Sequence, residues 1–174
     1  VWKLNYMYQL NRMAADARTS GNERYPEKFA AFHHLTFNIG KKLNIGVFES
    51  VVFSPQDSVN DNSFDYSYLN PVIFFRAIEQ QYGSSDNALL GLDFKWNAFK
   101  KVSMYGQLVL DEFKLDEVMA GDGWWANKYS MQLGLKYIDV FGVSNLDLQA
   151  EFNAVRPYTY AHHSQYGSYS NYRQ

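Results

Sequence analysis

Seven segments of this chain alternate apolar and polar residues with a period of two. In 146–154, leucine, alanine or phenylalanine fills every even position, and aspartate, glutamine, glutamate or asparagine fills the positions between. Successive side chains of a strand point to opposite faces, so this period predicts strands with one apolar and one polar face. The seven segments are 2–10, 29–39, 43–53, 88–97, 102–112, 129–137 and 146–154.

The lengths of these segments and of their connections favour a membrane barrel. Each segment has about 9 to 11 residues, longer than the usual soluble strand of about 5 or 6 residues and matched to a tilted membrane strand. Short and long connections alternate, as they do in an up-and-down outer-membrane barrel. The short ones are 40–42, 98–101 and 141–145, and the long polar ones are 11–28, 54–87 and 113–128, followed by 156–174.

A soluble β-sandwich is the alternative fold, because it also alternates apolar and polar positions. Aromatic residues make up 18% of the chain, and several lie near segment ends, where an interfacial girdle would place them. The polar positions mix glycines, amides and single charges, as the wall of a lumen would. We therefore predict an all-β fold, an antiparallel up-and-down transmembrane β-barrel, with residues 1–174 forming part of a single domain.

Seven strands are expected to be only part of that barrel. Bacterial single-chain barrels have even strand numbers from about eight upward, and unpaired sheet edges do not survive facing lipid. We therefore expect an internal piece of a larger barrel, with a wrong strand count as the alternative. The net charge of −2 gives no nucleic-acid footprint, and the absence of cysteine excludes disulfides and Cys-based zinc sites.

Two features interrupt the alternation. Glu49 falls on the apolar face of 43–53, so we expect either a bulge at Glu49–Ser50 that returns it to the polar side or a location at the lipid headgroups. Residues 71–82 predict a short loop helix, with Asn70 as N-cap and Pro71 at the first helical position. That helix would either cover apolar surface at the rim or fold into the barrel mouth as a gate.

Aromatic and amide-rich loops provide the candidate contact surface. Tyrosine and tryptophan combine a flat apolar ring with a polar group, which suits stacking on sugar rings. The alternative is that these loops collapse onto one another and cap the lumen. The predicted ligand-binding residues are Trp124, Trp125, Arg156, Tyr158 and Tyr160.

No catalytic residue, metal site or cofactor is predicted. The chain lacks G-x-S-x-G, H-E-x-x-H, a P-loop and a Gly-rich dinucleotide turn. The histidine pairs 33–34 and 162–163 would point to opposite sides of an extended chain. The carboxylate pairs 111–112 and 116–117 show no sign of facing a cleft. A barrel hydrolase that uses one of the four histidines is the remaining enzymatic alternative.

Four stretches together resemble the Wzi-type capsule-assembly family of outer-membrane barrels, in the Bacteroidetes version that includes RemB-like gliding-motility proteins. The stretches are 69–96, 105–113, 123–137 and 145–163. The resemblance implies a large outer-membrane barrel, of which this chain is a middle-to-late piece, and offers no catalytic residues. For capsule members it implies a lectin-like role that holds surface polysaccharide, and for gliding-motility members a surface or machine-associated role.

Together these features predict a non-enzymatic protein of the bacterial outer membrane that attaches or assembles capsule or exopolysaccharide through its external loops. Its expected partners are outer-membrane lipid and surface polysaccharide, and no nucleic acid. In the alternative, the chain is a structural subunit of a larger cell-envelope complex for gliding motility, secretion or nutrient uptake, and its partners are the other subunits.

Overall fold

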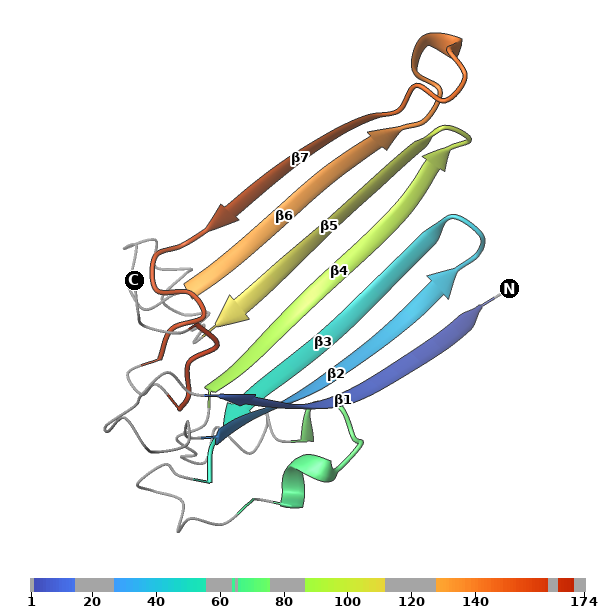
Figure 1. Ribbon diagram of the computed structural model, residues 1–174. Helices are drawn as coiled ribbons and strands as arrows, with labels where there is room; N and C mark the ends of the chain where they lie inside the picture. Colours follow the sequence, from blue (N-terminus) through green and yellow to red (C-terminus); the bar gives the residue numbers. More distant parts are fainter. Residues whose placement is uncertain are drawn as a thin grey trace, which may run out of the picture.

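The computed structural model describes residues 2–14, 27–55, 64, 66–75, 87–111, 128–162 and 166–170. These residues form one seven-stranded antiparallel sheet whose strand order is the chain order (Figure 1). The predicted all-β, up-and-down arrangement is therefore confirmed. The strands are β1 (Lys3–Ala14), β2 (Glu27–Ile39), β3 (Leu43–Phe53), β4 (Asn87–Phe99), β5 (Val102–Asp111), β6 (Lys128–Tyr137) and β7 (Leu148–Val155).

The sheet has two unlike ends. At one end, called the turn end, residues 40–42 join β2 to β3, residues 100–101 join β4 to β5, and residues 138–147 join β6 to β7. The last connection includes a short 3₁₀ turn, Val140–Gly142, and is longer than the predicted 141–145. The opposite end, called the loop end, is where β1, β3 and β5 finish (Figure 1).

Strand register gathers the apolar residues on one face, called the apolar face. The pairing is antiparallel throughout and, apart from a register shift between Trp96 and Phe99 at the end of β4, keeps each cross-strand row on a single side of the sheet. One complete row shows the composition of this face: Leu4, Phe37, Ile45, Phe94, Gly106, Leu133 and Phe152.

The opposite side, called the polar face, carries the residues between. Its neighbouring row mixes amides and charges with one tyrosine and one glycine: Lys3, Asn38, Asn44, Lys95, Tyr105, Gly134 and Glu151. The alternation in the sequence thus becomes two chemically different surfaces of one sheet.

Burial is concentrated at the loop end, where one segment folds over each face (Figure 1). On the apolar face, residues 66–75 bring Tyr68 against Phe53, with ring centroids 3.9 Å apart. On the polar face, residues 156–162 and 166–170 bring Tyr160 and Tyr169 against a cluster that contains Phe48. Each segment removes from water a part of the sheet that its strands leave open.

The predicted bulge at Glu49–Ser50 is wrong. Pairing continues without interruption through Glu49, which lies opposite His33 on β2 and Leu90 on β4. Glu49 stays on the apolar face, where it is only 2% exposed. Its Oε1 atom accepts a hydrogen bond from the backbone N–H of Phe74, so a covering segment, rather than a change of register, supplies a partner, while its buried Oε2 atom has none among the described residues.

The predicted helix at 71–82 falls only partly within the described residues. The side chain of Asn70 accepts a hydrogen bond from the N–H of Val72 at 3.0 Å, as expected of an N-cap. Phe74, however, has φ +65°, which places it in the left-handed region, so no regular helix runs through 71–75. Residues 76–82 lie outside the described part. Among the described residues, no helix has the length and apolar character needed to cross a bilayer.

Candidate functional site

The apolar face is the largest candidate functional surface. Leu92, Leu133 and Phe152 are each more than half exposed, with exposures of 52%, 51% and 57%. This face also contains a hollow of about 350 Å³ bordered by Phe94, Gly106, Leu133 and other, mostly apolar, residues. Exposed apolar side chains on this face extend over several neighbouring strands, and exposed apolar surfaces of this kind are where proteins commonly contact lipid or other proteins.

Few ionic groups interrupt this face. Within the described strands, charged or imidazole side chains enter it only at Arg12, Glu27, His33 and Glu49. Arg12 and Glu27 form an ion pair at the loop end. His33 and Glu49 are cross-strand neighbours, and both are less than 7% exposed.

Segment 66–75 covers the His33 and Glu49 side chains. The hydroxyl of Tyr6 bonds both the ring of His33 and the carbonyl of Pro71, and Phe74 donates its N–H to Glu49. Segment 66–75 therefore shields both His33 and Glu49, the two polar side chains of this face that lie away from the Arg12–Glu27 ion pair.

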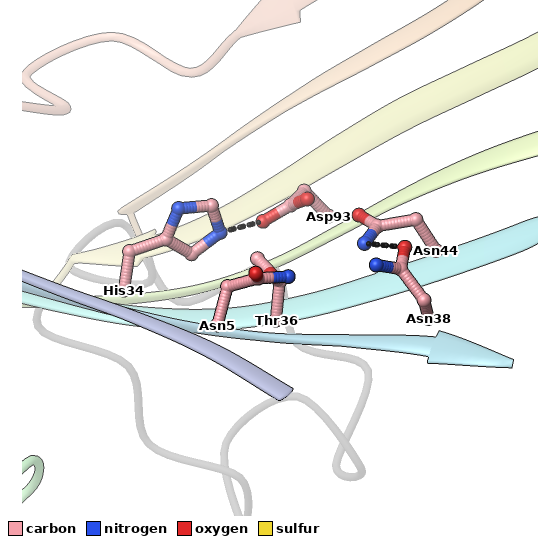
Figure 2. A network of polar contacts seen from close by, with 6 residues as sticks. All are labelled: Asn5, His34, Thr36, Asn38, Asn44 and Asp93. Atoms are coloured by element: carbon pink, nitrogen blue, oxygen red, sulfur yellow. Dashed lines mark hydrogen bonds and ion pairs between the residues drawn. The ribbon is translucent and has the colours of Figure 1, made fainter. Parts of the chain in front are cut away.

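A network of polar side chains crosses the polar face (Figure 2). His34 on β2 reaches over β3 to Asp93 on β4, with Nε2 and Oδ2 2.7 Å apart. Gly46 lies between them, and a Cβ at this position would collide with both side chains. One row closer to the turn end, Asn44 Nδ2 donates to Asn38 Oδ1 at 2.9 Å.

A second polar group lies on β5 and β7. The hydroxyl of Tyr105 donates to Glu151 at 2.7 Å and accepts from Gln149 at 2.7 Å. The ring of Tyr105 lies over Gly134 of the strand between, where a Cβ would overlap it. Here again a glycine on the middle strand lets side chains two strands apart meet.

The polar face brings an imidazole and a carboxylate together. An imidazole held by a carboxylate occurs in catalytic triads, but no serine or threonine hydroxyl among the described residues bonds His34. In the same part of the chain, no group of three His, Asp or Glu side chains is placed to hold a metal ion. The His34–Asp93 pair links β2 to β4. The hydrolase alternative would need a nucleophile bonded to this histidine, and the described residues include none.

The predicted contact residues separate at the loop end. Tyr158 is 74% exposed, and the guanidinium of Arg156 lies over the ring of Tyr129, 5.7 Å from its centroid. Tyr160 instead turns toward the sheet: its hydroxyl bonds Ser130 and its ring packs on the polar-face cluster. Trp124 and Trp125 lie outside the described residues.

Sequence reasoning missed the buried groups that hold segment 156–170 on the sheet. The Lys28 ammonium donates to the carbonyl of Ser168 at 2.7 Å, and that of Lys128 donates to the carbonyl of Ala161 at 2.8 Å. Burial against the sheet also raises the pKa of Tyr169 above its ordinary value. The sequence shows only that Lys28 and Lys128 lie at polar positions near one end of their strands. It does not show which segment will cover these two lysines.

No family model, curated protein or solved structure matches this chain. The resemblance to the Wzi-type family therefore stays a prediction. The function proposed below is therefore argued from the apolar and polar faces of the sheet.

Proposed function

We propose that this chain is a non-enzymatic outer-membrane β-barrel protein that holds surface polysaccharide at the loop end of its strands. In this proposal the apolar face contacts lipid and the polar face lines the interior. The observation that carries it is the series of largely apolar rows across seven strands, exposed outside the covered loop end, with its two central polar groups shielded by segment 66–75.

Strand dimensions support a membrane location. The seven strands have 8 to 13 residues, and a tilted strand needs about 9 to 11 to cross the hydrocarbon core. Water would make these apolar rows costly at about 25 cal/mol per Å². A bilayer removes that cost without requiring a second layer of protein.

The two edges of the sheet support a larger barrel. Among the described residues, β1 pairs only with β2, and β7 pairs only with β6. An unpaired backbone group in lipid costs several kcal/mol. We therefore propose that further strands complete the barrel between β7 and β1.

The loop end supports contact with a glycan. Arg156 and Tyr158 lie there: the exposed ring of Tyr158 suits the apolar face of a sugar, and the guanidinium of Arg156, which lies over the ring of Tyr129, suits an acidic group. The connection that contains Trp124 and Trp125 also starts and ends at the loop end, because β5 ends at Asp111 and β6 begins at its partner Lys128.

Site-directed spin labels test the membrane orientation. The chain has no cysteine, so single labels can be placed at Leu108 on the apolar face and at its neighbour Gln107 on the polar face. In outer-membrane lipid, the label at 108 should be accessible to oxygen and the label at 107 to a water-soluble nickel complex. Equal access of the nickel complex to both positions would overturn the lipid assignment.

Glycan binding tests the loop-end surface. Trp124→Ala, Trp125→Ala and Tyr158→Ala should each weaken retention of the surface polysaccharide about 2- to 10-fold, the loss expected for one stacking ring. Trp96→Ala is the matched control, because Trp96 lies on the apolar face toward the turn end. Unchanged retention in all three loop variants, with a stoichiometric protein partner recovered from solubilised membranes, would favour the envelope-complex alternative.

A further inference from the structure

A lysine-lined cavity opens at the turn end, away from the proposed glycan surface. Its volume is about 490 Å³, within the range of roughly 300 to 1,000 Å³ that is usual for small-molecule sites. The lining includes Lys3, Lys95, Lys41 and Lys42, together with Asn38 and Asn44, and contains no carboxylate.

Strand register builds the floor of the cavity. Lys3, Asn38, Asn44 and Lys95 are consecutive cross-strand partners on β1, β2, β3 and β4. At about 4.8 Å per strand, the two lysines stand about 14 Å apart and flank the hydrogen-bonded amide pair shown in Figure 2. Flexible four-carbon stems let both ammonium groups bend toward a ligand held over the amides.

The β2–β3 turn adds two further cations. Gly40 has φ +66°, a left-handed conformation that favours glycine. The turn that follows places Lys41 and Lys42 at the mouth of the cavity, and both side chains are exposed.

These lysines lack the counter-charges that other lysines at the turn end have. Lys101 pairs with Asp139 at 3.3 Å, and Lys136 pairs with Asp147 at 3.5 Å. Among the described residues, no carboxylate pairs with the four lysines of the cavity. The carboxylate nearest to Lys95 along the polar side of β4 is that of Asp93, and His34 holds it.

We propose that this cavity binds a multivalent oxyanion of the phosphate class. Lysine binds phosphate as a point charge, and the outward N–H groups of the amide pair can orient its oxygens. A bound anion would relieve the mutual repulsion of four cations gathered in one place. The site goes beyond the proposed glycan contact and holds whether or not the apolar face meets lipid.

Calorimetric titration with inorganic pyrophosphate tests the site on the whole chain in zwitterionic detergent. Lys3→Gln and Lys95→Gln should each weaken binding about tenfold, because each removes one charge-assisted contact. Lys101→Gln and Lys136→Gln are the matched controls, since they remove the same charge from lysines that already have partners. These should stay within about twofold of the parent chain at the same ionic strength.

A second arm uses vesicles that contain phosphatidylglycerol, to separate a lipid headgroup from a free phosphate. Pyrophosphate binding that depends on Lys3 and Lys95 assigns the site to a soluble anion, and vesicle binding with the same dependence assigns it to a headgroup. Either result supports the proposal. Absence of binding to both probes, or equal losses in the control variants, overturns it.

Discussion

Glycines on the polar face decide which side chains can meet there. Gly46 gives space to the His34–Asp93 pair, and Gly134 lies beneath the ring of Tyr105. Such close approach across a middle strand requires a residue without Cβ. The sequence shows these glycines among polar positions but does not show which neighbours lie over them, because that depends on register.

Gly46→Ala should therefore destabilise the sheet. The added methyl group would occupy the position of the Asp93 carboxylate and the His34 ring, and forced displacement of this kind costs about 1 to 3 kcal/mol. The free energy of unfolding in detergent, measured by denaturant titration, should fall by that amount. The same substitution in a His34→Ala/Asp93→Ala background is the control, and an equal loss there would show that the pair is not what the methyl group disturbs.

Two side chains have surroundings that the sequence does not show, for the same physical reason. Glu49 stays on the apolar face without a bulge, and Tyr160 turns inward to Ser130. In both cases the partner comes from a distant part of the chain. The backbone N–H of Phe74 bonds Glu49, and the hydroxyl of Ser130 on β6 bonds Tyr160. Alternation reports the side of a strand that a residue occupies, and it contains no information about which loop returns to cover that side.

At the scale of elements, the strands could be predicted and the covering segments could not. Each predicted alternating segment overlaps a strand, because the period of two follows directly from strand geometry. β1 continues to Ala14, four residues beyond the predicted end. Segment 66–75 has no such period, and its left-handed Phe74 interrupts the first turn of the helix predicted at 71–82.

The bond between Glu49 and segment 66–75 predicts a difference between two substitutions. Glu49→Gln keeps a side-chain oxygen that can accept the N–H of Phe74, whereas Glu49→Leu leaves that N–H without its partner. Loss of a hydrogen bond to a charged group costs about 1.5 to 3 kcal/mol, so amide exchange at Phe74 should accelerate at least about tenfold in the leucine variant. Similar exchange rates in the two variants would mean that the packing of the Tyr68 ring on Phe53, rather than the bond to Glu49, holds the segment on the sheet.

The β6–β7 connection should loosen at low pH. The pKa of Asp139 lies below its ordinary value of 3.8, chiefly because its carboxylate accepts the N–H of Asn145 and also because it pairs with Lys101. A lowered pKa in the folded state means that this stabilisation is complete above 3.8 and is lost as the pH falls through the folded value. The amide signal of Asn145 should therefore change below pH 3.8. In Asp139→Asn that acid transition should disappear, and Asp147→Asn should leave it in place.

At the scale of the whole molecule, two faces and two ends give four distinct environments. The apolar face is open over most of its length, and the polar face holds networks of side chains. The loop end is covered on both sides, whereas the turn end carries the lysine cavity. The two faces could be predicted from alternation alone. The cavity could not, because its lysines come from distant parts of the sequence and meet only through the register of four strands.

The proposed barrel requires the outer edge of β7, the edge away from β6, to be paired with another strand. The N–H of Arg156 donates to the carbonyl of Tyr129, so the alternation of an antiparallel ladder directs the N–H of Phe152 toward β6 and that of Asn153 away from it. Proline removes the N–H and is tolerated in sheets only where that N–H faces an open edge.

If a further strand pairs with β7 in the membrane, Asn153→Pro should reduce folded protein in the outer membrane as severely as Phe152→Pro does. Asn153→Ala controls for loss of the side chain, which bonds Glu151 at 2.8 Å, and should leave most of the protein folded. Protease resistance of intact outer membranes measures all three variants. Wild-type resistance in Asn153→Pro, beside a loss in Phe152→Pro, would mean that β7 remains an open edge, and the proposed barrel would fail because lipid cannot satisfy the backbone groups of such an edge.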